Sequence, residues 1–401
     1  MSNSIDVVVI GAGLSGLMCA IQAADRGLSV LVLDRCDTVG GKHCYTSMGA
    51  GALTNARLDV SRFHGREARF VTDAISHFDT PALHHWFAAR GVTLTEAEYY
   101  GLVCPPDAAD AIEALVTALE QAGAELRCGV NVESVQRTAT GFSVNDVSAR
   151  AVVLATGGAN LPQLGGGNEG YDLAEALGHR VQRAHPAHVG ITVAESWVTH
   201  LPGLWMDVEL KLQVGRKITD SVGSMLFTGS GLTGEAVFNL SAQVEPGISA
   251  DPELRVNFHP AMHFDDVAEW MHRVFGERTR EQSDSAIDYI IPRALGEQLL
   301  ARQNVKPGTR VMQLSEAQRK GLLQDMTSMQ LRVTGTMGMR AAESCSGGVH
   351  VRDVDPRTFS SRHVPGLYIV GRMLDVSGDW GGFEQHFALA SGWLAGRNLL
   401  Q

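Results

Sequence analysis

The sequence predicts an α/β protein with two parts: a three-layer domain built on a parallel sheet, and a mixed β/helical domain inserted into it. Three apolar strands predict the first part, one near each end of the chain and one in the middle, at residues 5–10, 152–155 and 366–370. Near-continuous apolar runs of this kind are typical of parallel strands that helices cover on both faces. The segment between the second and third strands has a different, mixed pattern.

The length supports two domains, because 401 residues exceed what one hydrophobic core usually holds. We expect residues 1–185 and 331–401 to form one discontinuous domain, with residues 186–330 inserted as a substrate or cap domain. Inside the insertion we expect strands at 188–193, 205–214 and 255–259, and helices at 265–276 and 293–303.

Composition narrows the function classes. The net charge is −11 and no Lys/Arg-rich run exists, so we expect no nucleic-acid partner. The longest uncharged opening stretch is punctuated by glycines and is short for a membrane span. Six cysteines without C-x-x-C spacing predict a reducing, cytoplasmic location and no metal site. The oligomeric state stays open.

The chain opens with a strand, a glycine-rich turn, a helix, a second strand and an acid, in that order. The apolar run at 5–10 leads into Gly-Ala-Gly-Leu-Ser-Gly at 11–16, which has G-x-G-x-x-G spacing. A helix is predicted from Leu14 to Arg26, and a second strand at 29–33 ends directly before Asp34. This order is typical of a Rossmann-like dinucleotide site.

Each residue type in this motif has a physical role. Gly11 permits the tight turn, Gly13 lets the backbone approach a pyrophosphate, and Gly16 lets helix and strand pack closely. The start of the helix offers free N–H groups and a positive dipole end. Asp34 can accept hydrogen bonds from ribose hydroxyls. The cofactor contacts expected from this motif are Gly11, Gly13, Leu14, Ser15, Gly16, Asp34 and Arg35.

Two later motifs favour FAD over NAD as the dinucleotide. The strand at 152–155 ends in Ala155-Thr156-Gly157, and the last strand ends at Gly371 with Asp375 four residues later. A Gly-Gly pair at 381–382 then opens a helix predicted over 383–399. A dinucleotide site built from both ends of the chain is typical of flavoproteins. The dipole of the last helix would stabilise negative charge on reduced flavin.

The glycine-rich segment 165–170 also has G-x-G-x-x-G spacing and precedes a helix at 171–177. It admits an alternative interpretation as a second site, for NAD(P)H. Residues 160–163 separate it from the preceding strand, however, and no acid-tipped second strand follows. We therefore predict an ordered loop near the flavin, and keep NAD(P)H as a candidate transient reductant.

Further segments are difficult to match by chance. They are Gly40-Gly41-Lys42 with Thr54-Asn55, Ala155–Gly158 with Gly170-Tyr171 and Gly178-His179, Leu226–Thr228 with Gly231–Gly234 and Asn239–Ser241, Ser346–Val349, and Pro365–Gly382. With the opening motif they resemble the BaiN-like flavoproteins, also called the aminoacetone-oxidase family of FAD-binding enzymes. The resemblance covers most of the chain. It implies bound FAD, an inserted second domain and redox chemistry on carbon–carbon or carbon–nitrogen bonds. The additional FAD contacts it implies are Gly41, Lys42, Val132, Ala155, Thr156, Gly157, Gly371, Asp375, Gly381, Gly382 and Phe383.

The chain departs from that family next to the expected flavin. Residues 47–53 replace a glycine-rich stretch ending in Arg-Cys-Asn, Arg372 replaces an acid and Glu384 replaces an amide. We hypothesise that Arg372 and Glu384 form an ion pair beside the flavin; the alternative is an exposed, unrelated Arg372. Together with His43 and His386 they are the candidate catalytic residues. A histidine can donate a proton near neutral pH, and a purely structural role is its alternative.

The sequence thus predicts an FAD-dependent oxidoreductase that passes hydride between flavin N5 and a small, hydrophobic organic substrate. Reduction or desaturation of a carbon–carbon double bond is favoured by the resemblance. Two alternatives stay open: an amine or amino-ketone oxidase that uses oxygen, and a flavin-binding protein without turnover.

Overall fold

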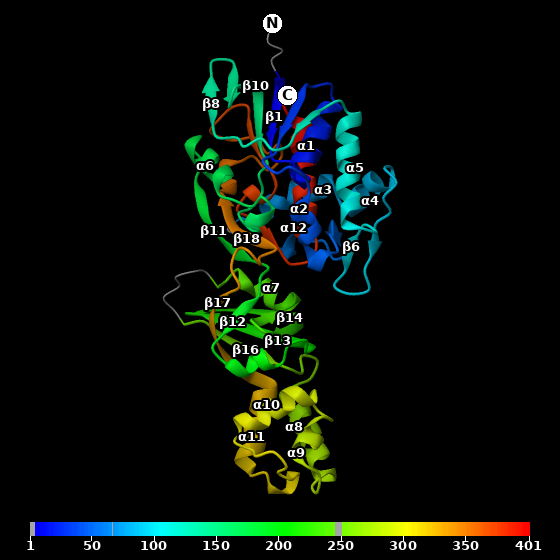
Figure 1. The fold of residues 1–401 in the computed structure, drawn as a ribbon, viewed down its shortest axis with the longest axis vertical. Coiled ribbons are helices and arrows are strands. Elements are labelled where there is room, and N and C mark those ends of the chain that lie inside the picture. Colours follow the sequence, from blue (N-terminus) through cyan, green and yellow to red (C-terminus); the bar gives the residue numbers. More distant parts are fainter. Residues whose placement is uncertain (1–4, 66, 245–250) are drawn as a thin grey trace. The chain divides into compact units, whose positions relative to one another are not determined.

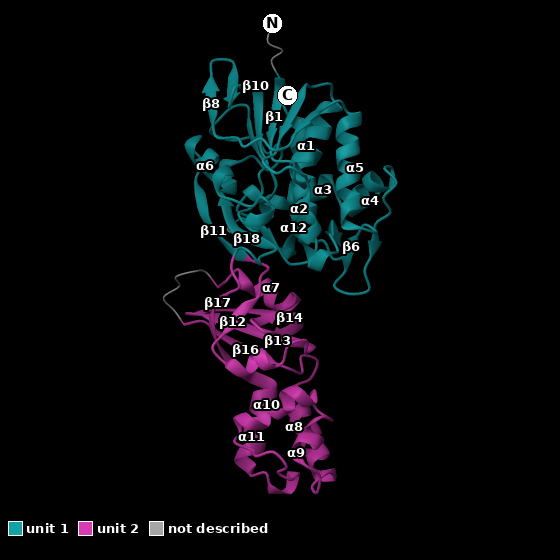
Figure 2. Cartoon of the chain, in the orientation of Figure 1, with its two compact units in different colours: residues 1–186, 339–401 teal, residues 187–338 magenta. Residues whose placement is uncertain are grey.

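The computed structural model describes residues 5–65, 67–244 and 251–401, and the chain divides into two compact units. Unit 1 comprises residues 1–186 and 339–401, and unit 2 comprises residues 187–338 (Figure 2). The sequence placed the return to the first domain at residue 331. The return lies later because strand β17 (Met329–Thr336) pairs with two strands of unit 2.

The sheet of unit 1 contains the predicted parallel strands (Figure 1). Within the described residues its order is β7-β2-β1-β10-β9-β8, and β19 also pairs with β10. The bounds are β1 Ile5–Ile10, β2 Val30–Leu33, β7 Glu125–Arg127, β8 Val135–Thr138, β9 Gly141–Val144, β10 Val147–Leu154 and β19 Leu367–Ile369. β1 runs parallel to β2 and β10, and β10 runs parallel to β19, whereas β8 and β9 form an antiparallel edge. Both ends of the chain therefore contribute to one sheet.

The helices of unit 1 are α1 Leu14–Ala24, α2 Gly41–Tyr45, α3 Thr72–His77, α4 Thr80–Ala88, α5 Ala108–Gln121, α6 Glu169–Ala176 and α12 Phe383–Asn398. Its short strands are β3 Thr54–Asn55, β4 Phe63–His64, β5 Thr95–Glu96, β6 Leu102–Cys104, β11 Val181–Ala187, β18 Ser344–Val349 and β20 Ser377–Gly378. These strands form small sheets in which β11 pairs with β18, β20 with β4, and β6 with β3 and β5.

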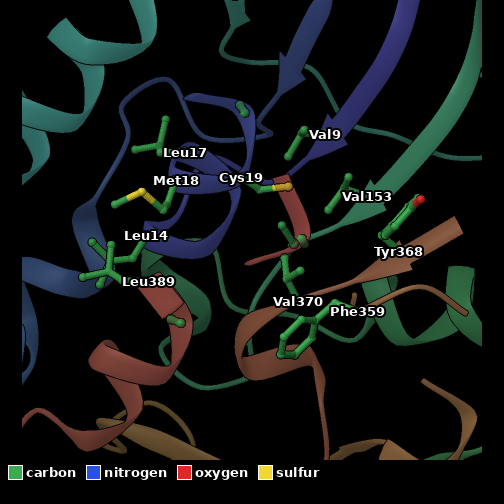
Figure 3. Packing of buried hydrophobic residues seen from close by; sticks show 14 of the residues in the cluster. Val9, Leu14, Leu17, Met18, Cys19, Val153, Phe359, Tyr368, Val370 and Leu389 are labelled. Atoms are coloured by element: carbon green, nitrogen blue, oxygen red, sulfur yellow. The ribbon is translucent and has the colours of Figure 1, made fainter. Parts of the chain in front are cut away.

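Helices α1 and α12 pack against each other at very short range. A Cβ atom on Gly392 would lie 2.2 Å from the Ser15 carbonyl oxygen, and one on Gly396 would lie 2.4 Å from that of Cys19. Glycine at these two positions therefore lets the helix backbones meet. Figure 3 shows side chains from both helices and from the strands around one core, including Val9, Leu17, Cys19, Val153, Val370 and Leu389.

Unit 2 combines a closed barrel with helices, as its mixed pattern predicted. The barrel order is β12-β15-β14-β13-β16-β17. Its strands are β12 Ile191–Val193, β13 Trp205–Val214, β14 Lys217–Thr228, β15 Gly231–Thr233, β16 Glu253–Asn257 and β17; its helices are α7 Glu235–Ser241, α8 Phe264–Glu277, α9 Ser283–Ile287, α10 Arg293–Arg302 and α11 Glu316–Ser328. The strand predicted at 188–193 begins at Ile191, because His188 has a left-handed backbone with φ of 47°. Among the described residues, every helix is too short or too polar to span a bilayer.

Candidate active site

Unit 1 contains a cleft that is open to solvent. Its empty space, including the open mouth, measures about 940 Å³. Six elements of unit 1 meet at this cleft. They are the start of α1, the ends of β2 and β10, helix α2, the start of β18 and the first turn of α12. Its lining residues are Gly11–Ser15, Asp34, Cys36, Thr38, Gly40–His43, Thr46, Ala155–Gly158, Asn160, Leu164, Gly165, Glu343, Ser344, Arg372, Glu384, Gln385 and Ala388. Segments from both ends of the sequence therefore form one site.

The start of α1 is built to receive an anion. Its N-cap, Gly13, has no side chain to cap the helix, and the first turn contains no acidic residue. Gly13 has an ordinary extended backbone, and a Cβ atom there would meet nothing within 4 Å. Neither conformation nor protein packing therefore requires glycine at this position. The open space beside exposed N–H groups fits a phosphate, as the motif predicted.

Gly11 and Gly16 have a different role from Gly13. A Cβ atom on Gly16 would lie 1.9 Å from the Gly11 carbonyl oxygen, and one on Gly11 would lie 2.4 Å from the Ala155 carbonyl oxygen. These glycines therefore permit the close approach of strand, turn and helix. Gly16 lies outside the cleft lining, and its close packing agrees with the packing role predicted for it; its contact with the cofactor stays a prediction.

A second space, of about 500 Å³, adjoins the cleft at Asp34. Asp34 Oδ2 accepts a hydrogen bond from Ala12 N at 2.6 Å, and its Oδ1 accepts one from Cys36 N at 2.8 Å. The predicted contacts Arg35 and Val132 line this space. Carboxylate, turn and helix start are thus fixed together, in the arrangement that binds a ribose beside a pyrophosphate.

The glycine-rich loop 165–170 packs against this same site. Arg35 donates hydrogen bonds to the carbonyl oxygens of Gly165 and Gly166, both at 2.7 Å, and pairs with Glu169 at 2.9 Å. A Cβ atom on Gly166 would lie 1.7 Å from the Asn160 carbonyl oxygen. These glycines serve packing within the chain, which agrees with the predicted ordered loop.

Lys42 and Thr156 are polar residues of the cleft lining. Lys42 Nζ donates to the Gly158 carbonyl oxygen at 2.9 Å, and burial lowers the pKa of this amine. Thr156 Oγ1 is buried without a hydrogen-bond partner among the described residues. Buried polar atoms are rarely left unpaired, so this hydroxyl fits a bound group with hydrogen-bonding atoms.

Arg372 and Glu384 form the ion pair that the sequence suggested. Arg372 Nε lies 3.2 Å from Glu384 Oε2, and the side chains are 13% and 7% exposed. Glu384 also accepts hydrogen bonds from the Ser344 hydroxyl and from Gly378 N, the latter at 3.4 Å. Burial opposes the charge on Arg372, but Glu384 and other nearby groups hold its pKa above the ordinary value. The pair places a neutralised charge in the cleft wall.

The whole arrangement can be compared with known proteins. Residues 5–398 match the family model described as the HI0933-like protein Rossmann domain. The chain belongs to this family. The match confirms the resemblance drawn from the sequence, and it makes this HI0933-like protein an FAD-dependent oxidoreductase.

Two curated HI0933-like relatives match nearly their full length. The chain is 30% identical over 398 residues to the 3-dehydro-bile acid delta(4,6)-reductase of Clostridium scindens, covering 97% of each chain. It is 27% identical over 404 residues to the ribosomal RNA dihydrouridine synthase of Escherichia coli, covering 98% of each.

The two candidate histidines of this HI0933-like chain occupy different environments. His43 lines the cleft, is buried, and has no partner for either ring nitrogen among the described residues. His386 is fully buried, with Nδ1 2.9 Å from Thr54 Oγ1 and Nε2 2.8 Å from the Phe78 carbonyl oxygen. His386 lies outside the cleft lining and both its ring nitrogens have partners, which favours the structural alternative; its catalytic role stays a prediction.

Five other predicted contacts also lie outside the lining: Gly371, Asp375, Gly381, Gly382 and Phe383. Their contact with FAD stays a prediction, and glycines among them also pack closely against neighbouring segments. A Cβ atom on Gly371 would lie 2.4 Å from Ser15 Oγ, and one on Gly382 would lie 2.2 Å from the Thr54 carbonyl oxygen. Conversely, sequence reasoning missed lining residues such as Asn160, Glu343 and Gln385, whose side chains belong to no recognisable motif.

The buried histidines predict an acid-sensitive fold. Burial lowers the pKa of His43 and of His386 to about 4, whereas an unfolded histidine titrates near pH ~6.5. As the pH falls, the unfolded state therefore binds protons before the folded state does. The free energy of unfolding decreases between pH ~6.5 and pH ~4. From pH ~6.5 to ~5.5 we expect the free energy of unfolding to fall by about 1 kcal/mol for each histidine.

Urea denaturation at the two pH values checks this expectation. The variant H43L should lose about 1 kcal/mol less than the wild type over this pH interval. H272Q, which changes an exposed histidine of α8, should behave like the wild type. An equal pH dependence in H43L and wild type would contradict the assignment.

Proposed function

We propose that this HI0933-like protein uses FAD to reduce a carbon–carbon double bond in a small, hydrophobic molecule. The observation that carries the proposal is the cleft, in which an uncapped helix start, the carboxylate of Asp34 and the Arg372–Glu384 pair share one solvent-open space. The names of both full-length relatives describe reduction of a carbon–carbon double bond, in a bile acid or in uridine. Desaturation is the same chemistry in reverse.

The residues present fit FAD. The start of α1 would hold the pyrophosphate, Asp34 the adenosine ribose, and Thr156 and Lys42 the middle of the cofactor. When bound there and reduced by NAD(P)H, the flavin would supply the hydride that the reduction needs. The neutral Arg372–Glu384 pair keeps net charge low along the opposite wall.

Polar groups of the cleft can stabilise the charge that develops in such a reduction. Hydride addition to a conjugated ketone places negative charge on the carbonyl oxygen, and hydrogen-bond donors aimed there lower the barrier. His43 is neutral at pH ~7, because burial lowers its pKa to about 4. A neutral imidazole can donate a hydrogen bond through its ring N–H, but it is too weak an acid to transfer that proton near pH ~7. We therefore propose that His43 polarises the substrate, and that the proton comes from water or another donor.

The electron source is part of the proposal. NAD(P)H would act as a transient reductant that approaches the flavin from the cleft. We propose no separate dinucleotide site at the loop 165–170, because Arg35 binds the carbonyl oxygens of Gly165 and Gly166 and Gly166 packs against the Asn160 backbone.

A spectrum and a set of anaerobic reactions test the proposal. Purified protein should show the absorbance of oxidised flavin, and mass analysis should identify released FAD. The flavin is then reduced chemically and mixed separately with a conjugated steroid ketone or an unmodified ribosomal RNA fragment. A further sample of oxidised enzyme is mixed with a primary amine.

Fast reoxidation by the ketone alone would support the proposal. Reoxidation by RNA alone would move the substrate to nucleic acid, and reduction of oxidised enzyme by the amine would favour an amine oxidase. Flavin that responds to none of the three would contradict this substrate class and favour a binding protein without turnover. A colourless protein that takes up no FAD would overturn the cofactor assignment itself.

A further inference from the structure

Glu343 lines the cleft and connects three segments of unit 1. Its own carbonyl oxygen accepts a hydrogen bond from Asn160 Nδ2 at 2.8 Å. Its carboxylate accepts hydrogen bonds from Ser47 N at 2.8 Å, from Met48 N at 3.2 Å and from Trp380 Nε1 at 2.8 Å. Asn160 and Glu343 both line the cleft, so this residue ties together segments that are far apart in the sequence.

The loop bound by Glu343 has an unusual backbone. Ser47 has φ of 54°, and Met48 has φ of 57° and ψ of 31°. Residues with a Cβ atom disfavour this left-handed region, and two in succession need external support. Successive backbone N–H groups in such turns form a concave site for an anion. The carboxylate of Glu343 occupies that concavity from the side of the cleft.

The contact with Trp380 extends the same support to α12. Trp380 is buried, directly precedes the Gly381-Gly382 pair, and packs edge-on against Tyr100 with ring centroids 5.5 Å apart. Gly382 is the N-cap of α12, and Glu384 in its first turn lines the cleft. A shift of Trp380 would therefore be passed to the wall that holds the Arg372–Glu384 pair.

We propose that Glu343 is a positioning residue: it holds Ser47 and Met48 in their left-handed conformation and fixes Trp380 at the start of α12, which together shape the cleft for flavin and substrate. The effect of Glu343 on flavin binding rests on the proposed function, whereas its effect on the backbone of Ser47 and Met48 does not. It depends on the negative charge and on both carboxylate oxygens, because all three donors are N–H groups.

The variant E343Q tests this role with little change of volume. Its amide nitrogen would face an N–H donor, so at least one of the three hydrogen bonds is lost. We expect hydrogen exchange of the Ser47 and Met48 amides to accelerate by about tenfold or more. FAD affinity should fall by about tenfold or more, and the visible circular dichroism of bound flavin should change. The matched control E277Q, at an exposed position at the end of α8, should change none of these.

Glycine substitutions separate positioning from general destabilisation. Glycine adopts left-handed conformations readily, so S47G/M48G should leave the wild-type background nearly unchanged and restore most of the FAD affinity lost in E343Q. Unchanged amide exchange in E343Q would overturn the inference, and that readout does not depend on FAD. Loss of affinity that the glycines fail to restore would overturn the role in the left-handed turn. Wild-type protein that binds no flavin would instead contradict the proposed function.

Discussion

Replacing Glu384 with alanine is expected to destabilise unit 1 by about 3–5 kcal/mol. The change removes the partner of the nearly buried Arg372, whose side chain is 13% exposed, and leaves an uncompensated positive charge in the cleft wall. It also removes the acceptor of the Ser344 hydroxyl and of Gly378 N. Urea denaturation of the FAD-free proteins measures the loss, because bound FAD would shift the apparent stability by an amount that depends on its affinity.

An exposed ion pair of the same unit provides the control. Arg127 and Glu125 lie 2.7 Å apart at the edge of the sheet, with side chains 49% and 55% exposed. E125A should therefore cost less than about 1 kcal/mol. Replacing both buried partners, in R372M/E384M, should recover much of the stability because no unpaired charge remains. If E384A costs no more than E125A, Arg372 is not held as a buried charge.

Alanine at Gly16 should reduce stability, whereas alanine at Gly13 should reduce FAD affinity. G16A places a Cβ atom 1.9 Å from the Gly11 carbonyl oxygen, which is backbone and cannot move aside. We expect a loss of about 3 kcal/mol or more in the free energy of unfolding. In G13A the added methyl meets nothing of the protein within 4 Å, so the fold should be retained. The methyl instead occupies the space assigned to phosphate, and FAD affinity should fall roughly 5–150-fold.

Melting temperature and FAD titration distinguish the two variants. G13A should melt near the wild-type temperature in the absence of FAD and gain less from added FAD. G16A should melt far lower with or without cofactor. Wild-type FAD affinity in G13A would show that the space beside α1 does not receive the phosphates.

The opening motif could be predicted because its chemistry is local. The strand, turn and helix that position Gly11, Gly13 and Asp34 lie within one short stretch, and their spacing determines the geometry. The last strand could also be recognised, because its apolar run is long enough to show a buried strand. The ion pair of Arg372 and Glu384 was predicted from two charges whose motifs were expected to meet.

The position of His386 outside the cleft lining has a geometric reason. An α-helix turns by about 100° per residue, so Glu384 and Ala388 share the face of α12 that lines the cleft. His386 lies two residues from each and faces the interior. Without a neighbouring helix for reference, the sequence could not show which face of α12 meets the cleft.

The features that the sequence could not predict depend on tertiary contacts. Glu343 belongs to no motif, and its donors at Ser47, Met48 and Trp380 are distant in sequence. The sequence predicted strands in unit 2 but not their closure into a barrel. In β14 the apolar residues Ile218 and Val222 are exposed, at 60% and 62%, so alternation along this strand does not mark its buried face.

The glycine contacts between α12 and α1, with the pairing of β19 and β10, constrain how the polypeptide matures. Synthesis proceeds from the N-terminus, so the phosphate-binding turn emerges from the ribosome long before residues 367–398 exist. Until those residues arrive, the nascent chain has an open sheet position at β10 and an uncovered face on α1. The enzyme should therefore acquire its coloured cofactor only after residues 367–398 have been made, and premature termination within α12 should yield apoprotein prone to aggregation.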